Sequence, residues 1–165
     1  MTGVIFIATL HLMVGLPGSG KTTQAIRLEK KYHALRLTPD EWHYRLFGND
    51  FHNDDSVDGE HDRRHTTIEQ IMQDTAERVL EMGGDVILDF GCWARVERDA
   101  LRARAAALGA DFKIHYMECS KEELWERLQE RNRLAGELPV FSVTRESLDK
   151  WYSVFQPPEK DELEP

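Results

Sequence analysis

The segment Gly15-Leu16-Pro17-Gly18-Ser19-Gly20-Lys21-Thr22 constrains the possible folds more than any other part of the chain. It matches the pattern G-x-x-x-x-G-K-[S/T] in full, follows an apolar run that ends at Val14, and precedes a helical pattern. Glycines at such a junction let backbone N–H groups surround a phosphate at the positive end of a helix. The motif therefore predicts a nucleotide site where a buried strand turns into a helix.

Each part of the motif has a chemical task. Lys21 can reach the β- and γ-phosphates of a nucleoside triphosphate, and the Thr22 hydroxyl can ligate Mg²⁺. We therefore expect ATP and Mg²⁺ as cofactors. The residues expected to hold the nucleotide are Gly15, Pro17, Gly18, Ser19, Gly20, Lys21, Thr22 and Thr23.

The remaining hydrophobic pattern predicts strands that alternate with helices. Four strand-like runs cover residues 6–14, 34–38, 85–89 and 112–119, and amphipathic helical patterns separate them. Nearly continuous apolar strands in this arrangement are typical of a parallel sheet covered on both faces, a three-layer α/β sandwich. We expect one domain over residues 1–165, with loops or lids at 47–65 and 132–143 and a frayed acidic tail at 158–165.

Composition narrows the class of partner. The chain has 21 basic and 30 acidic side chains, a net charge of −9, which argues against a protein that grips long nucleic acids but permits a small anionic substrate. The apolar N-terminal run is shorter than the roughly 20 residues that a spanning helix needs, so no membrane association is expected. Two cysteines suit a reducing compartment, and we expect a cytoplasmic protein.

Two acids follow predicted strands, at the sheet edge where open parallel sheets bind ligands. Asp40, after the second strand, can orient an acceptor hydroxyl and take its proton, or it can serve as a helix-start acid beside the capping pair Thr38 and Glu41. Asp89 ends an apolar strand and suits a water-bridged Mg²⁺ or a substrate hydroxyl; the alternative is a turn aspartate before Gly91.

Phosphoryl transfer also needs positive charge on the migrating group. Arg127, Arg131 and Arg133 lie along one predicted helix that leads into a lid at about 131–143, and we favour Arg131 as the lid arginine. The alternative is a solvated helix face paired with glutamates of the same helix. Substrate contacts are also expected from three residues after the third strand: Trp93, Arg95 and Arg98. For Trp93 the alternative is an ordinary packing role.

Two further groups of side chains leave alternatives open. The spacing of His61 and His65 suits a metal, but their acidic surroundings favour a solvated loop. Trp42, Tyr44 and Phe47 can stack on a substrate ring or form the apolar face of a helix.

Several of these stretches together resemble the small AAA_33-type P-loop kinases, similar to the group of chloramphenicol phosphotransferase, zeta toxin and polynucleotide 5′-kinase. The resemblance covers nearly the whole chain and rests on residues 15–22, 37–41, 86–89, 127–133 and 155–158. It implies a fold of five parallel strands, like that of nucleoside monophosphate kinases, and ATP-dependent phosphorylation of a hydroxyl. It also implies that Asp40 is the base, that Asp89 is the strand-end acid, and that Arg131 or Arg133 is the lid arginine.

The expected function is therefore an ATP-dependent kinase for a small-molecule hydroxyl, such as a metabolite, a nucleoside-sugar or an antibiotic. A 5′-hydroxyl nucleic-acid kinase is the first alternative, although the chain has no run of Lys and Arg to form a basic channel. A nucleotide-dependent switch with slow ATP hydrolysis is the second.

Overall fold

A four-stranded parallel sheet forms the centre of the protein, as the computed structural model of residues 7–52, 59–134 and 141–164 shows. The strand order is β2-β3-β1-β4, and Leu12 of β1 pairs with both Leu88 and Ile114. The bounds of the strands are β1 Thr9–Val14, β2 Leu35–Leu37, β3 Val86–Gly91 and β4 Asp111–Tyr116.

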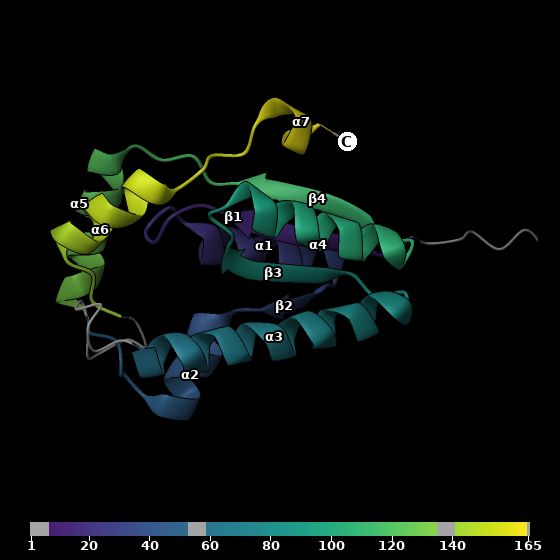
Figure 1. Cartoon of the computed structure of the whole chain (residues 1–165), viewed down its shortest axis with the longest axis horizontal. Helices are drawn as coiled ribbons and strands as arrows, with labels where there is room; N and C mark the ends of the chain where they lie inside the picture. Colours follow the sequence, from purple (N-terminus) through teal and green to yellow (C-terminus); the bar gives the residue numbers. More distant parts are fainter. Residues whose placement is uncertain (1–6, 53–58, 135–140, 165) are drawn as a thin grey trace, which may run out of the picture.

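Helices cover both faces of this sheet (Figure 1). Alternate strand residues such as Leu10 and Leu12 pack with Met72 of α3 and Leu101 of α4, whereas Met13 packs on the other face with Leu28 of α1. The bounds of the helices are α1 Lys21–Tyr32, α2 Pro39–Phe47, α3 Gly59–Glu81, α4 Arg95–Ala107, α5 Lys121–Arg133, α6 Arg145–Val154 and α7 Lys160–Leu163.

Helices α5 and α6 lie beyond the carboxyl ends of the strands (Figure 1). Their buried leucines, Leu124, Leu128 and Leu148, pack with Leu16 of the glycine-rich loop in a separate apolar cluster. The two helices therefore support the loop where the predicted nucleotide site lies.

The structure confirms the parallel α/β sandwich but shows four strands in the described residues, where the resemblance implied five. The four runs found from the hydrophobic pattern correspond to β1–β4. After β4 the described chain continues as α5, α6 and α7, and α7 packs beside β4 (Figure 1). Within the described residues, no helix has the length and apolar character needed to cross a membrane.

The prediction of a loop at 47–65 is wrong from residue 59 onward, where the structure has a helix. Helix α3 begins at Gly59, two turns before its apolar pattern starts, and His61 in the first turn is buried. A buried imidazole is tolerated here because Asp50 accepts a hydrogen bond from the His61 ring. The part of the predicted loop at 53–58, and residues 135–140 of the predicted lid, lie outside the described residues.

The C-terminal segment, expected to be frayed, forms the short helix α7 and contributes a buried charge. Glu162 pairs with Arg98, and both side chains are fully enclosed, with Nε to Oε1 at 2.7 Å and Nη2 to Oε2 at 3.0 Å. Arg98 also donates to the carbonyls of Cys92 and Trp93. This buried pair therefore joins α7 to the loop that follows β3.

We expect the substitution Glu162→Gln to lower the free energy of unfolding by about 3–5 kcal/mol, because it leaves the buried Arg98 charge without a partner. Urea denaturation measures the change. Asp161→Asn is the matched control: Asp161 pairs with Arg95 at the surface, where water screens the pair, so its loss should be much smaller. Equal losses in the two variants would contradict the structural role of the buried pair.

Candidate active site

The glycine-rich loop between β1 and α1 has the backbone that a phosphate cradle needs. Gly18 and Gly20 have φ values of 86° and 93°, in the left-handed region that side chains disfavour. A Cβ on Gly18 would also lie 3.1 Å from Leu128 Cγ, so α5 packs against the loop where it has no side chain. The amino end of α1 follows directly, so its free N–H groups and helix dipole favour an anion here.

Lys21 and Thr22 open α1 beside this loop. Nζ of Lys21 donates to the carbonyl of Leu16 at 3.0 Å, which holds the ammonium over the loop. Burial lowers the pKa of Lys21, and the carboxylates of Asp89 and Asp40 oppose that shift. An ammonium enclosed in this way has exchanged much of its water for protein contacts, and a phosphate can replace the Leu16 carbonyl as its partner.

The strand expected to end at Asp89 continues to Gly91, so Asp89 lies inside β3, where it accepts hydrogen bonds from two neighbouring segments. Its Oδ2 accepts from Thr22 Oγ1 at 2.6 Å and from Thr38 Oγ1 at 3.3 Å. Its Oδ1 is buried and has no hydrogen-bond partner among the described residues. Burial raises the pKa of Asp89, while the Thr22 bond and the Lys21 charge oppose the shift.

This pair of oxygens fits a hard cation. Mg²⁺ prefers carboxylate, hydroxyl and water oxygens, and an orphaned buried carboxylate oxygen beside a threonine hydroxyl offers two of them. Thr22 and Asp89 are therefore the residues that would hold Mg²⁺, directly or through water.

Asp40 lies in the first turn of α2 and lines the same cavity as Lys21, Thr22 and Asp89. Its carboxyl is 68% exposed because it faces the open cavity, and Oδ1 lies 3.1 Å from Nε2 of His65. The surrounding protein alone would raise the pKa of Asp40, but the hydrogen bond and charge of His65, with the charges of Lys21 and Arg131, lower it below its usual range. Asp40 is therefore kept ionised.

His65 bridges two carboxylates. Its Nδ1 lies 3.7 Å from Glu69 Oε1, on the side of the ring away from Asp40. The surrounding protein would lower the pKa of His65, but the bond to Asp40 and the charges of Asp40 and Glu69 outweigh it and raise that pKa. We interpreted this stretch as a solvated loop, and its contact with Asp40 could not be found from spacing because the two residues are 25 positions apart.

The expected capping box at the start of α2 is not formed. Thr38 has no capping hydrogen bond; its hydroxyl accepts from Arg36 and donates to Asp89. Glu41 pairs with Arg36, with Nη1 to Oε1 at 2.8 Å. The Thr38 hydroxyl therefore binds Asp89 in the site and does not cap the helix, and Glu41 neutralises Arg36, which donates to that hydroxyl.

The three arginines of the predicted lid helix occupy different positions. Arg131 and Arg127 line the cavity, with Nη2 of Arg131 donating to the carbonyl of Phe141 at 3.2 Å. Burial lowers the pKa of Arg131, and the charge of Asp40 opposes this shift. The Nε of Arg131 is buried and has no hydrogen-bond partner in the described part of the chain. Arg133 is exposed and pairs with Glu130, as a solvated-face arginine does.

The cavity has a volume of about 810 Å³, and two groups of residues line it. The first is polar and comprises the glycine-rich loop with Lys21, Thr22, Asp40 and Asp89. The second is a set of rings that includes Trp93, one of the predicted substrate contacts. The other predicted contacts after β3, Arg95 and Arg98, are not brought to the cavity, because both are paired with acids of the C-terminal segment.

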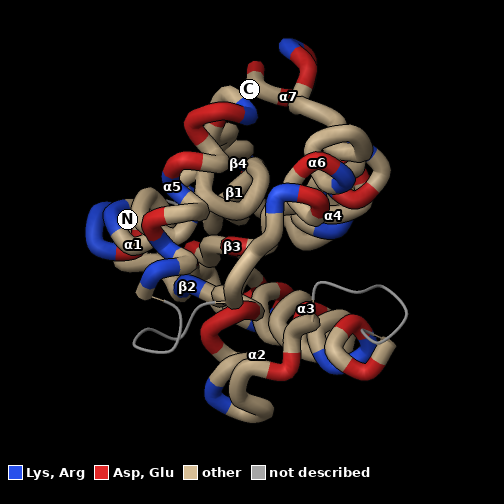
Figure 2. Tube along the Cα trace, turned by 90° about the vertical axis from the view of Figure 1, so that its left-hand side faces the viewer, with Lys and Arg blue, Asp and Glu red and all other residues tan. Residues whose placement is uncertain are grey.

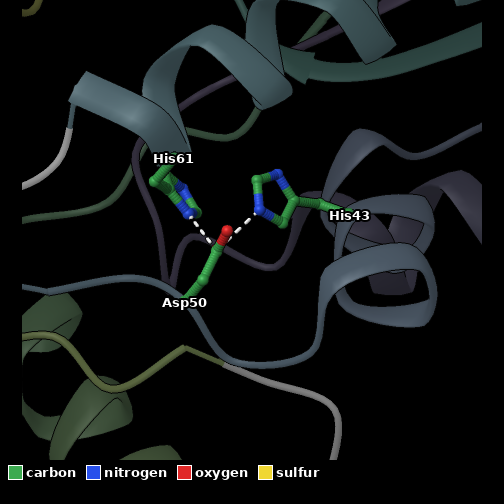
Figure 3. A group of neighbouring side chains, drawn as sticks. All are labelled: His43, Asp50 and His61. Atoms are coloured by element: carbon green, nitrogen blue, oxygen red, sulfur yellow. Dashed lines mark hydrogen bonds and ion pairs between the residues drawn. The ribbon is translucent and has the colours of Figure 1, made fainter.

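Sequence reasoning missed a cluster beside the cavity, in which two imidazoles approach one carboxylate (Figure 3). His43 Nε2 and His61 Nδ1 lie 2.7 Å and 2.6 Å from Asp50 Oδ1, and Arg64 donates to Asp50 Oδ2 at 2.9 Å. The two rings and Oδ1 could hold a metal by their spacing, but the adjacent guanidinium disfavours a second cation. We interpret the cluster as a hydrogen-bonded support for His61, which lines the cavity.

The fold and the loop geometry define a P-loop protein of the α/β class, with the site at the carboxyl edge of a parallel sheet. The family model described as an AAA domain, AAA_33, matches residues 10–158. The chain belongs to this family, whose P-loop fold implies nucleotide binding. No curated protein sequence matches the chain.

Solved structures show the same fold at low sequence identity. A candidate kinase from Chloroflexus aurantiacus has a TM-score of 0.73 and 18% identity, over 93% of this chain and 82% of that one. A gluconokinase from Sinorhizobium meliloti has a TM-score of 0.58 and 15% identity, over 94% of this chain and 79% of that one. A chain of the Pnkp1/Rnl/Hen1 RNA repair complex has a TM-score of 0.65 and 19% identity, over 92% of this chain and 45% of that one. At these identities the likeness shows the fold alone.

Because Asp40 raises the pKa of His65, we expect the substitution Asp40→Asn to lower it. The ion pair stabilises the fold in the window above the unfolded carboxyl pKa and below the unfolded imidazole pKa, about pH 4 to 6.5, and the contribution is lost as pH leaves that window in either direction. Two-dimensional NMR of the His65 ring during a pH titration measures the shift. Asp161→Asn, at the surface beside Arg95, is the control, and an unchanged His65 pKa in Asp40→Asn would contradict the contact.

Proposed function

We propose that the protein is an ATP-dependent kinase that transfers the γ-phosphoryl group to a hydroxyl of a small molecule. One observation carries the proposal: a carboxylate outside the nucleotide loop, Asp40, lines the same cavity as Lys21, Thr22 and Asp89. A carboxylate beside the phosphate loop can take the proton of an attacking hydroxyl or of water, and the likeness to structures described as kinases supports the hydroxyl.

The proposed reaction assigns one role to each residue. Asp40 accepts the proton of the acceptor hydroxyl while the hydroxyl oxygen forms a bond to the γ-phosphorus. The bond between that phosphorus and the β,γ-bridging oxygen breaks, and ADP leaves with the electron pair. Its lowered pKa keeps Asp40 ionised and so able to accept the proton at neutral pH.

Positive charge meets the migrating group from two sides. Lys21 holds the β- and γ-phosphates from the loop, and Arg131 approaches from α5, with a buried Nε that lacks a protein partner among the described residues. Such donors stabilise the charge that develops in transfer. Bound Mg²⁺ at Thr22 and Asp89 would neutralise further phosphate charge.

The charge distribution supports a small acceptor. The chain has a net charge of −9, and basic and acidic positions are mixed over the helices (Figure 2). A polymeric phosphodiester is bound chiefly by rows of Lys and Arg, and the sequence contains no run of these residues. A 5′-hydroxyl oligonucleotide therefore enters as an alternative acceptor in the test below.

The first experiment is ATP-dependent phosphorylation across a library of hydroxyl compounds, with the products identified by mass spectrometry. The library contains nucleosides, sugars, sugar acids, aminoglycosides, other antibiotics and a 5′-hydroxyl oligonucleotide. We expect one class of phosphorylated product, and Asp40→Asn to slow its formation by about 10²–10⁴-fold, because general base catalysis contributes about that much.

Binding separates this result from a damaged nucleotide site. Asp40→Asn should bind Mg²⁺-ATP as the unaltered protein does, measured by calorimetry, whereas Lys21→Met should bind it more weakly. ATP consumption that no acceptor changes would favour the nucleotide switch, and undiminished transfer by Asp40→Asn would remove the base assignment.

A second prediction distinguishes the arginines of α5. We expect Arg131→Gln to lower kcat by about 10²–10³-fold, because a donor aimed at the migrating group acts mainly in the transition state. Arg133→Gln is the matched control on the same helix and should leave kcat nearly unchanged, since that side chain is exposed and faces Glu130. Equal effects of the two substitutions on kcat would contradict the assignment of Arg131 to the migrating phosphoryl group.

A further inference from the structure

Five rings from different parts of the chain form a continuous surface in the cavity, which we call the aromatic wall. Its members come from the residues after α2, from α3, from the loop after β3, from the residues before α6 and from α6 itself. They are Phe51, His61, Trp93, Phe141 and Trp151.

Ring-to-ring contacts connect the members of the wall. Phe51 lies 5.8 Å from Phe141 and 6.2 Å from Trp151, measured between ring centroids, and Trp151 lies 5.6 Å from Trp93. His61 stands edge-on to Phe141 at 5.3 Å and an interplanar angle of 88°. Each distance is within the range of favourable aromatic pairs, so the rings support one another while they border the open cavity.

The aromatic wall lies beside the proposed base. The ring centroids of His61 and His65 are 6.0 Å apart and nearly parallel, and His65 contacts Asp40. Arg131, which would meet the phosphoryl group, donates to the Phe141 carbonyl. An acceptor that places its hydroxyl at Asp40 would therefore have its body against the wall.

The wall presents apolar ring faces and one polar ring. Asp50 is an acceptor, so His61 carries its proton on Nδ1 and, when neutral, has a lone pair on Nε2 that can accept a hydrogen bond (Figure 3).

The basic residues that line the cavity are Lys21, Arg27, Arg127 and Arg131. All of them belong to α1 or α5, next to the glycine-rich loop, and none to the segments that form the wall.

On the basis of the proposed function, we infer that the acceptor is an uncharged compound with a flat ring and a hydroxyl group. Flat rings gain most from stacked and edge-on contacts with the faces that the wall offers. The cavity cation that contacts the wall, Arg131 at the Phe141 carbonyl, is assigned to the migrating phosphoryl group. A carboxylate or phosphodiester on the acceptor would therefore lose water against the rings and find no further cation in the wall segments. The inference thus separates this site from one that takes a sugar acid or a nucleic-acid end.

The test compares flat alcohols with saturated alcohols of the same skeleton. Benzyl alcohol and 2-naphthalenemethanol are each titrated against the fully saturated counterpart, with Mg²⁺ and a non-hydrolysable ATP analogue present, and binding is followed by saturation-transfer NMR. We expect each flat compound to bind about two- to tenfold more tightly than its counterpart, the range that a favourable aromatic pair contributes.

Two wall variants and one control assign the binding to the wall. Phe141→Leu and Trp151→Leu should each weaken binding of 2-naphthalenemethanol by about threefold or more while Mg²⁺-ATP binding is retained, since each removes one ring. Trp42→Leu is the control, because Trp42 is a half-exposed tryptophan of α2 outside the cavity lining. Equal affinity for flat and saturated compounds, no binding of either, or equal losses in Trp42→Leu would overturn the inference.

The outcome is separable from that of the kinase proposal. Phosphorylation of a sugar acid or of the oligonucleotide, with no flat alcohol bound, would leave the kinase standing and remove the inferred acceptor class. Binding of flat alcohols through Phe141 and Trp151, with no hydroxyl compound phosphorylated, would keep the aromatic wall as a binding site and remove the kinase.

Discussion

The hydrogen bonds to Asp89 are the interactions on which the site most depends. Strand β3 lies between β1 and β2, and its Asp89 carboxylate accepts from Thr22 at the start of α1 and from Thr38, between β2 and α2. One buried oxygen thus fixes the nucleotide loop relative to the segment that carries Asp40. Because the charge is buried, it needs these donors to be tolerated, and losing either hydroxyl would cost more than an ordinary hydrogen bond.

The fold and the nucleotide side of the site could be predicted from sequence because local patterns determine them. Apolar runs located all four strands, and the glycine spacing located the loop, since left-handed backbone at Gly18 and Gly20 leaves few other residue choices. The fifth strand was wrong for the described residues because it came from the resemblance and not from any apolar run in this chain.

The acceptor side could not be predicted in the same way, because its contacts join residues far apart in the chain. From the sequence, His65 was interpreted as part of a solvated acidic loop. In the structure, α3 packs against α2 and the imidazole contacts Asp40 and Glu69. His61 carried a sequence signal, its spacing to His65, but its partners His43 and Asp50 come from a different segment. For Arg98, an arginine after a strand suggested a substrate contact, and only the tertiary structure shows Glu162 beside it.

The pair of Arg98 and Glu162 also links the loop after β3 to a residue far along the chain. The two residues are 64 positions apart, and Arg98 binds the carbonyls of Cys92 and Trp93 just before α4. During synthesis from the N-terminus, Arg98 is made 64 residues before its carboxylate partner, Glu162. The loop that presents Trp93 to the cavity therefore depends on a side chain 64 positions further along the chain than the arginine that holds it.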